Sequence, residues 1–439
     1  MVFNTGLLAF VQGLKLFSLR TRRDDDFTDR LSHHYTALFL LITSILISSK
    51  QYVGDPIHCW VPKEFSDPWQ KYANNYCWIK NTYTVPSYDF MSIPKPDERK
   101  KLEINYYQWV PIVLLIQSLL FYFPTIIWRI LNWTVGINIQ DMIGKAMDVC
   151  STIRTVPEKE KNDKTESKDE KEEQSSSKEE EPEVPGIIRD IANHLEISIE
   201  FVEKSKSNFV KALRNLFVCG FGSRKYGSYL ITLYFVTKLL YIINVIGQIF
   251  LLTHSLNVLV RFFGFKVLSD LGKGDDWKST GHFPRVTMCD FQIRNLGQRT
   301  NYSVQCVLPI NLFNKKIYIF IWFWIFLVSI LTVYSFFHWI FRMLSFQKVK
   351  FIRGLLLKGL NKWSGGDNDL LRSFINDYLK SDGVFLMYLI YINSGDIVTT
   401  QLLEVLWFRF KQKNKDSLKI TMTNMRMILN SYDSHYSNN

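Results

Sequence analysis

Four long apolar runs divide the chain into alternating apolar and polar stretches. They begin near Tyr35, Tyr106, Tyr226 and Ile317, and each is rich in aliphatic and aromatic residues. A helix needs roughly 20 apolar residues to cross a bilayer, and the runs are close to that length or longer. The pattern therefore predicts four membrane-spanning helices, with both ends of the chain on the same side.

The first 19 residues are amphipathic but too short and too polar to be a further span. At 100° per residue, Thr5, Leu8, Gln12 and Lys15 fall opposite an apolar arc. The members of that arc are Phe3, Leu7, Phe10, Val11, Leu14 and Phe17. Taken alone, this segment predicts a helix that lies on the surface of the bilayer.

Charged residues also occur at and inside the runs. Four aspartates between positions 24 and 29 precede the first run. Because they lack the spacing of a calcium loop, a solvated helix start is favoured over a cation site.

Lys238 lies inside the third run, and an intramembrane lysine is a functional candidate by default. A side chain that reaches back to the membrane surface is the favoured expectation here. His33 and His34 are expected to be residues of the membrane interface rather than pH sensors.

The polar segment between the second and third runs has two kinds of sequence. Residues 157–183 contain 12 acidic and 6 basic residues and no aromatic residue, so they cannot bury a core and are predicted to be disordered. On the carboxyl-terminal side, residues 190–216 carry apolar residues at helical spacing. The sequence therefore predicts folded helices on both sides of a charged insert.

Four of the six cysteines lie in the two segments that the runs place on one side of the membrane. Cys59 and Cys77 lie between the first and second runs, and Cys289 and Cys306 lie between the third and fourth. Disulfides persist outside the cytosol, so this side is expected to be extracellular. Four cysteines allow three connectivities. Cys59 with Cys306 and Cys77 with Cys289 is favoured over one disulfide within each loop, because it would join both loops into one rigid cap.

The charge distribution gives an independent test of orientation. Lysine and arginine number 35 in the amino-terminal arm, the 131–225 region with Arg129, and the tail after 340, against 15 in the two cysteine loops. Basic residues accumulate on the cytoplasmic side of a membrane protein. Both termini and the middle loop are therefore expected in the cytoplasm, in agreement with the cysteines. Cys150 and Cys219 are expected to be free cytoplasmic thiols.

Composition excludes several other classes of protein. The net charge of +12 comes without a basic stripe interleaved with aromatic residues, so it does not indicate nucleic-acid binding. The mean hydropathy of −0.03 averages over apolar runs and strongly polar loops. Paired carboxylates, metal-spaced His and Cys clusters and phosphate-binding glycine loops are not evident, so no enzyme activity, metal or cofactor is expected.

Long stretches of the chain resemble one protein family. They are GDPIHCWVP, WQKYANNYCWIKNTYTVP, YYQWVP, FPRVTMCDFQIRNLG, YSVQCVLPINLFNKKIYIFIWFW and LLRSFINDYLKSDGVFLMYLI. These stretches are similar to the innexins, the gap-junction proteins of invertebrates. The resemblance covers both cysteine loops, all four runs and part of the tail, and leaves out the 157–183 insert and about the last 20 residues.

The resemblance implies an all-α polytopic membrane protein with four transmembrane helices per subunit in a ring-shaped oligomeric channel. A small disulfide-linked extracellular α/β cap and a helical cytoplasmic domain complete the implied fold. The expected parts are an amino-terminal pore funnel, four spans, two extracellular loops, a cytoplasmic loop and a cytoplasmic tail. In chain order their bounds are 1–25, 26–53 (first span), 54–105, 106–130 (second span), 131–225, 226–262 (third span), 263–316, 317–341 (fourth span) and 342–439.

The resemblance also assigns roles to particular residues. It implies that the amino-terminal segment folds into the pore, so that Thr5, Leu8 and Gln12 line the permeation path. A largely neutral lining predicts weak ion discrimination and passage of small metabolites. The expected partners are other innexin subunits, eight in a ring, an apposed ring on a neighbouring cell, and membrane lipids. The expected location is the plasma membrane at gap junctions.

Two alternatives to an intercellular channel remain open. Asn301 begins a glycosylation sequon, Asn301-Tyr302-Ser303, in the second loop, and a glycan there could keep two rings apart and leave a plasma-membrane hemichannel. A second sequon at Asn132 falls on the cytoplasmic side and is expected to be unused. The other alternative is a non-conducting adhesion or receptor scaffold, for which the cysteine loops would serve equally well.

Overall fold

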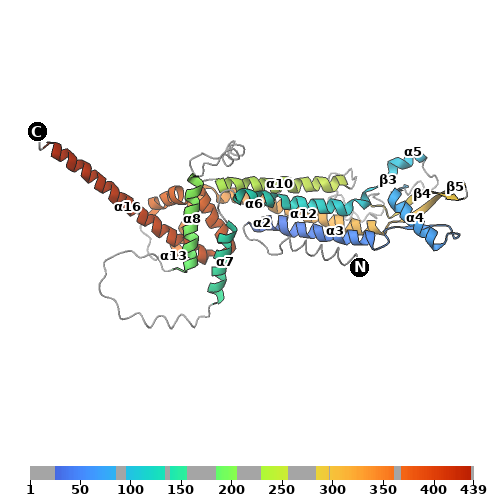
Figure 1. Ribbon diagram of the computed structural model, residues 1–439, viewed down its shortest axis with the longest axis horizontal. Helices are drawn as coiled ribbons and strands as arrows, with labels where there is room; N and C mark the ends of the chain where they lie inside the picture. Colours follow the sequence, from blue (N-terminus) through green and yellow to red (C-terminus); the bar gives the residue numbers. More distant parts are fainter. Residues whose placement is uncertain are drawn as a thin grey trace, which may run out of the picture. The chain divides into compact units, whose positions relative to one another are not determined.

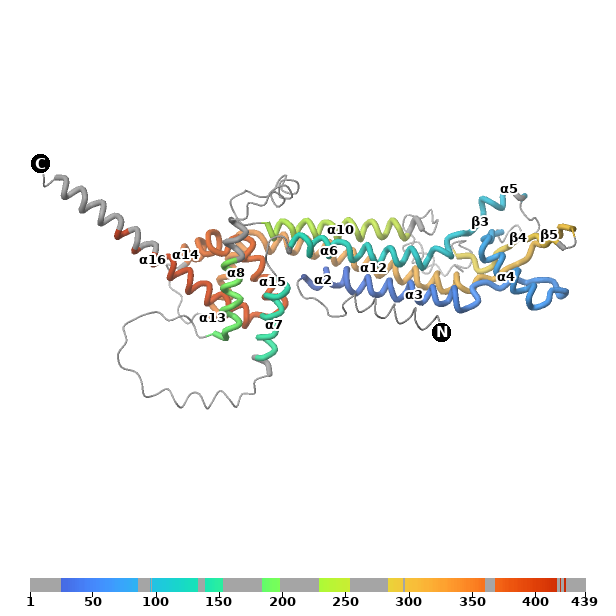
Figure 2. The backbone as a smooth tube through the Cα atoms, viewed as in Figure 1, coloured from blue at the N-terminus to red at the C-terminus, as the bar shows by residue number. Residues whose placement is uncertain are grey.

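The computed structural model describes residues 25–85, 95–133, 139–155, 184–204, 229–255, 283–295, 297–359 and 367–436. The chain divides into two compact units. The first unit consists of residues 1–27, 127–237 and 336–439, and the second unit of residues 28–126 and 238–335. Figure 2 follows the backbone through both units.

Within the described residues, four helical stretches are long and apolar enough to cross a membrane. The first, Phe27–Tyr52, consists of α2 (Phe27–Arg30), the π-helix η1 (Leu31–Thr36) and α3 (Ala37–Tyr52). The others are α6 (Val110–Trp133), α10 (Tyr229–Ser255) and α12 (Pro309–Arg342). In Figure 1, α3, α6, α10 and α12 run alongside one another. Residues of all four share one apolar core in the second unit, including Leu40, Leu114, Val245 and Ile321.

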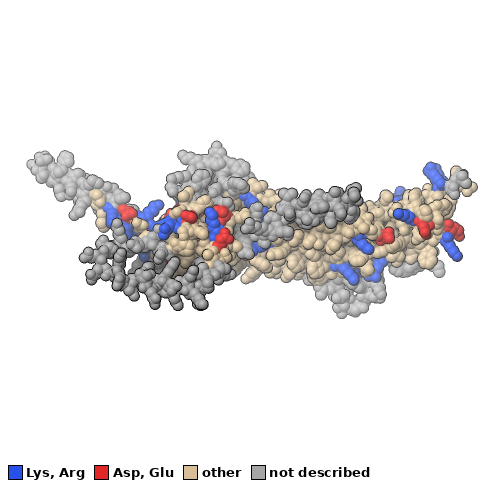
Figure 3. All heavy atoms as spheres, turned by 60° about the horizontal axis from the view of Figure 1, so that its bottom comes forward, with Lys and Arg blue, Asp and Glu red and all other residues tan. Residues whose placement is uncertain are grey.

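The bundle of the second unit is apolar outside and partly polar inside. Large apolar side chains are exposed along it, for example Leu46, Leu119 and Phe250. Thr43 and Gln117 are buried. In Figure 3 few charged side chains are visible on the helix surface, and those of this unit gather near and on the cysteine-containing end. Lipid-facing helices show this pattern because lipid solvates apolar side chains and not polar groups.

Polar side chains inside the bundle bond to main-chain carbonyls of neighbouring helices. Pro111 has no N–H, so the carbonyl of Tyr107, four residues earlier, has no backbone donor there. Gln51 Nε2 donates to that carbonyl oxygen at 2.7 Å. Ser44 Oγ donates to the carbonyl of Pro111 at 2.7 Å. These bonds tie α3 to the residues around the start of α6 and give backbone carbonyls donors that lipid could not supply.

The rest of the second unit is a small α/β structure, here named the disulfide lobe. Its sheet has the strand order β1-β5-β4-β2-β3, with the paired strands antiparallel. The strands are β1 (His58–Trp60), β2 (Thr82–Tyr83), β3 (Glu103–Ile104), β4 (Val286–Asn295) and β5 (Gln298–Val307). The short helices are α4 (Asp67–Lys80), α5 (Pro96–Arg99), η2 (Lys100–Leu102) and η3 (Tyr106–Gln108). The central hairpin β4–β5 therefore has strands from the other cysteine segment on both of its edges.

The first unit is helical and has its own core. It contains α7 (Ile139–Thr155), α8 (Gly186–Lys204), α13 (Ser345–Gly359), α14 (Asp367–Ser373), the π-helix η6 (Phe374–Leu379), α15 (Lys380–Ser394) and α16 (Asp396–Tyr436). The central element is α15, in which every residue from Asp382 to Leu389 is buried. Tyr234 of α10 and Trp339 of α12 pack with Phe385 of α15 at ring-centroid distances of 4.9 to 5.5 Å. This aromatic cluster joins two of the long helices to α15 within the unit.

The expected fold class is confirmed for the subunit: the part of the chain that the structure describes contains four candidate transmembrane helices, a helical domain and a small disulfide-linked sheet. The amino-terminal segment and the 157–183 insert lie outside the described residues.

Candidate functional site

Two disulfides join the cysteine segments into one body. Cys59 is bonded to Cys306 and Cys77 to Cys289, the pairing favoured by the sequence. Cys59 on β1 and Cys306 on β5 face each other in the strand register, and Cys77 lies on α4 against the same sheet. The sulfurs of Cys59, Cys77 and Cys306 lie within 4.8 Å of one another. Because they are oxidised in disulfides, they are not thiolate ligands for a metal.

Aromatic residues fill the inner face of the β4–β5 hairpin. Phe291 and Tyr302 face each other in the register and stack with centroids 5.5 Å apart. Phe65 and Tyr76 pack against Phe291 at 6.4 and 6.2 Å. Burial of these rings and both disulfides on one face leaves the alternate residues of the hairpin on the opposite face.

Asp290 is the polar centre of that opposite face. Its carboxylate accepts hydrogen bonds from Ser303 Oγ at 2.6 Å and from Tyr83 OH at 3.1 Å. It also forms an ion pair with Arg99 at 2.6 Å, and Lys80 Nζ donates to its main-chain oxygen at 3.1 Å. Asp290 therefore links both strands of the hairpin to β2, α4 and α5 of the other cysteine segment.

These contacts shift the protonation equilibria of the group. Partial burial opposes ionisation of Asp290, but hydrogen bonds from Ser303 and Arg99 and the charge of Arg99 hold its pKa below the ordinary value. Burial, and next the negative charge of Asp290, raise the pKa of Tyr83 to about 12. Asp290 is thus ionised and Tyr83 is a neutral donor at physiological pH.

The outer end of the hairpin is exposed and polar. Arg294 and Arg299 lie directly opposite each other in the register, and both are exposed. Two like charges in a cross-strand pair destabilise a sheet by themselves. Asn301, the predicted glycosylation residue, is also exposed on β5 and faces Gln292 of β4. This end of the hairpin is therefore better suited to contact with another molecule than to stabilising the lobe.

A second polar site lies inside the helix bundle of the second unit. Lys238 of α10 has a fully buried side chain, and its ammonium lies 2.8 Å from a carboxylate oxygen of Asp29, whose side chain is also buried. The ammonium also donates to Ser335 Oγ of α12 at 2.6 Å and lies 3.4 Å from Thr28 Oγ1. The expectation that Lys238 reaches back to the membrane surface is wrong, because a buried counter-ion is available within the bundle.

Asp25, Asp26 and Asp29 do not form the solvated helix start that the sequence favoured, and Asp24 lies outside the described residues. Asp25 and Asp29 are 6% and 3% exposed. Within the first unit, Asp26 accepts a hydrogen bond from Trp339 Nε1 at 3.1 Å and caps the N–H of Phe27. Asp29 is paired with Lys238 and Asp26 bonds Trp339, and both partners are distant in the sequence.

His33 extends the polar site along the first span. Its Nδ1 lies 2.7 Å from the main-chain oxygen of Asp29 and 3.3 Å from the hydroxyl of Tyr241, which in turn bonds Thr125. It is 4% exposed, so it is a buried member of the bundle and not an interface residue as expected. This site occurs where η1 replaces α-helical turns, and π-helical turns are frequent at functional positions.

The sequence did not identify Asp290 or the partner of Lys238. Their interactions join residues about 200 positions apart, and periodicity carries no such information. The predicted pore-lining residues Thr5, Leu8 and Gln12 lie outside the described residues, as does Cys219. Cys150 is a free cysteine on α7.

Comparison with known proteins agrees with this architecture. The family model for innexins matches residues 25–410. The chain belongs to the innexin family. It is 38% identical over 392 residues to Innexin unc-9 of Caenorhabditis elegans, covering 89% of this chain and 93% of that protein. It is 34% identical over 421 residues to Innexin-19 of Caenorhabditis briggsae, covering 90% of this chain and 89% of the relative.

Membership of the innexin family establishes the general function. The chain is a gap-junction channel subunit of the plasma membrane that assembles with innexin subunits, and innexins are channel proteins rather than enzymes. The four candidate spans and the two disulfides agree with this assignment.

Proposed function

We propose that this innexin forms a ring of eight subunits that docks through its disulfide lobe onto a ring in the neighbouring cell. The observation that carries the proposal is the β4–β5 hairpin, whose inner face is locked by disulfides and aromatic rings while its outer end is exposed and charged. A rigid, pre-organised surface reduces the entropy cost of association. The lobe then faces the extracellular space, and both termini are cytoplasmic.

We further propose that the amino-terminal segment lines the pore, with Thr5, Leu8 and Gln12 facing the permeation path. These side chains are neutral, so the channel passes ions of both signs and small metabolites. Substituting Leu8→Glu is expected to raise the permeability ratio of cations to anions, whereas Leu7→Glu, on the opposite arc, is expected to impair assembly instead. Equal reversal potentials for wild type and a correctly assembled Leu8→Glu channel would contradict this placement.

The docking proposal is tested in paired cells that each express the full chain. Junctional conductance and transfer of a small dye are measured together with the membrane current of single cells. Arg294→Glu places opposite charges across the tip of the hairpin, and we expect it to abolish junctional conductance while the single-cell current persists. If junctional conductance survives both Arg294→Glu and Arg299→Glu, the hairpin tip is not the docking surface.

The hemichannel alternative is favoured by one observation, the exposure of Asn301 on the outer face of β5. A glycan on this side chain would project from the surface proposed to dock. Asn301→Gln removes the sequon, and Ser303→Thr is the matched control because it keeps the sequon and the hydroxyl that bonds Asp290. Coupling that appears only in Asn301→Gln would establish the hemichannel as the native form. Equal coupling in wild type and both variants would exclude a glycan block.

A further inference from the structure

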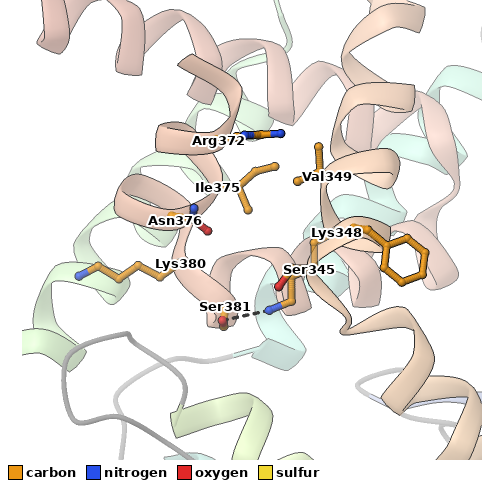
Figure 4. Close-up of a pocket in the computed structure, with 9 residues that line it drawn as sticks. Ser345, Lys348, Val349, Arg372, Ile375, Asn376, Lys380 and Ser381 are labelled. Carbon is orange, nitrogen blue, oxygen red and sulfur yellow. Dashed lines mark hydrogen bonds between the residues drawn. The ribbon is translucent and has the colours of Figure 1, made fainter. Parts of the chain in front are cut away.

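A cavity of about 530 Å³ lies in the first unit, between α13, α14, η6 and the start of α15 (Figure 4). Its volume is within the range of roughly 300 to 1,000 Å³ that is common for small-molecule sites. Lys348, Arg372 and Lys380 line it, and no carboxylate is among its described lining residues. A lining whose only formal charges are positive selects for an anion.

Arg372 is the cation most available to a ligand. Among the described residues, its guanidinium has no hydrogen-bond or ion-pair partner, and the side chain is exposed. Lys348 is more restricted: its ammonium donates to Ser381 Oγ at 3.1 Å, and burial lowers its pKa against the opposing charge of Asp382. In Figure 4, Arg372 and Lys348 lie at opposite ends of the cavity, and the Lys380 side chain extends away from the other labelled groups. A guanidinium binds phosphate through two parallel hydrogen bonds.

Neutral donors complete the polar part of the lining. Ser345, Asn376 and Ser381 contribute hydroxyl and amide groups. α13 begins at Ser345, so the positive end of its helix dipole faces the same region. Hydroxyl, amide and guanidinium donors together match a phosphate, which offers several acceptor oxygens and no donor when fully ionised.

The position of the cavity along the chain favours a lipid as the source of that phosphate. Ser345 comes three residues after Arg342, the last residue of the fourth candidate span. Three extended residues reach at most about 10 Å. The headgroup layer adds roughly 5 to 8 Å on each side of the hydrocarbon core. With the membrane-crossing part of α12 taken to end near Arg342, the edge of the cavity is within reach of the lipid headgroups around that end.

Apolar side chains next to the cavity agree with this source. Phe341, Leu344 and Phe346 are 51%, 43% and 60% exposed, and Phe346 lines the cavity itself. Exposed aromatic and aliphatic side chains at the end of a span are suited to acyl chains and to the membrane interface. A soluble phosphate would leave this apolar surface unexplained.

We propose that the cavity binds the phosphorylated headgroup of an anionic membrane lipid, with Arg372 as the main phosphate contact and Phe346 against the acyl chains. The site is separate from the disulfide lobe, and the proposal does not depend on docking or on the identity of the pore-lining residues.

The test uses the purified full chain in detergent with dioctanoyl phosphatidylinositol 4,5-bisphosphate as the probe, and measures its dissociation constant. Arg372→Gln is expected to weaken binding roughly tenfold, because a charged donor to phosphate is lost. Arg353→Gln is the matched control, since Arg353 is an exposed arginine on α13 that does not line the cavity. It is expected to change binding less than twofold. Unchanged thermal unfolding of both variants shows that they are folded.

Further arms of the experiment identify the source of the phosphate. Dioctanoyl phosphatidylcholine is expected not to compete, and inositol 1,4,5-trisphosphate is expected to compete only at about tenfold higher concentration, because it lacks the acyl chains that contact Phe346. Phe346→Ser is expected to weaken binding of the lipid and to leave binding of the free headgroup unchanged. Equal affinity for lipid and free headgroup would overturn the assignment to a lipid. Equal effects of Arg372→Gln and Arg353→Gln on the dissociation constant would overturn the assignment of the phosphate site to this cavity.

Discussion

Asp382 provides a direct test of the packing in the first unit. It is a buried carboxyl at the start of α15, and it accepts a hydrogen bond at 3.1 Å from the N–H of Ile231 in the first turn of α10. Burial raises its pKa to about 7, although the backbone N–H groups of Ile231, Leu230 and Tyr229 and the charge of Lys348 act in the opposite direction. Asp382→Asn keeps an acceptor oxygen at the helix end and removes the charge.

The sign and size of the expected effect follow from linkage. The ordinary pKa of the carboxyl is 3.8 and the folded value is about 7, so the native state binds more protons than the unfolded state between these values. The free energy of unfolding therefore falls as pH rises through this window. At about 1.4 kcal/mol per pKa unit the whole effect is about 4 kcal/mol, of which about 2 kcal/mol falls between pH 5 and pH 7. The asparagine variant lacks this loss.

The assay is thermal or denaturant unfolding of the purified chain in detergent, followed by tryptophan fluorescence between pH 5 and pH 8. We expect the stability of Asp382→Asn relative to wild type to increase by about 2 kcal/mol from pH 5 to pH 7. Asp369→Asn on α14 is the control, because it makes the same substitution at an exposed carboxyl of the same unit. A constant difference between Asp382→Asn and wild type would refute the argument.

Three further predictions follow from the other polar contacts. Lys238→Met leaves Asp29 buried without its counter-ion and should lower the free energy of unfolding by about 3 to 5 kcal/mol. The double variant with Asp29→Leu should recover most of that loss in unfolding assays, and additive losses would contradict the pairing. Asp290→Ala should lower the free energy of unfolding by only about 1 kcal/mol, because the ion pair with Arg99 is partly exposed. The contribution of Asp290 should be lost only as pH falls through its depressed pKa, below the ordinary value of 3.8, and a loss near neutral pH would contradict this. Lys380 has φ +57°, so Lys380→Gly should raise the unfolding temperature and Lys380→Ala should not.

The large-scale features of the fold could be predicted from the sequence. Run length alone indicates the four spans, because a bilayer imposes a minimum length on an apolar helix. The favoured disulfide pairing rested on one geometric assumption, that the two cysteine segments pack side by side. In the structure Cys59 and Cys306 lie on neighbouring strands, which satisfies that assumption. By contrast, β1, β2 and β3 have only two or three residues each, too few for alternation to be visible.

The polar sites could not be predicted in the same way. Four aspartates among arginines are typical of a solvated helix start, and the local sequence of Asp29 contains nothing to indicate burial. Its partner Lys238 lies 209 residues away, so only the packed bundle shows that the two charges meet. Asp290 lies between the buried residues Cys289 and Phe291, so the alternation of the strand predicts an ordinary outward-facing residue. Its role depends on Arg99 and Tyr83, which come from another segment.

The three polar sites share a physical logic that applies within each unit. Each joins residues far apart in sequence, by 191 positions for Arg99 and Asp290, 209 for Asp29 and Lys238, and 151 for Ile231 and Asp382. For Asp29 and Lys238, which lie on candidate spans, apolar contacts between helices compete with equally apolar acyl chains and so discriminate poorly between alternative packings. A charged or hydrogen-bonded pair does discriminate, because each wrong packing leaves a polar group without a partner. Directional polar contacts therefore select one arrangement of elements that hydrophobic burial alone would leave poorly specified.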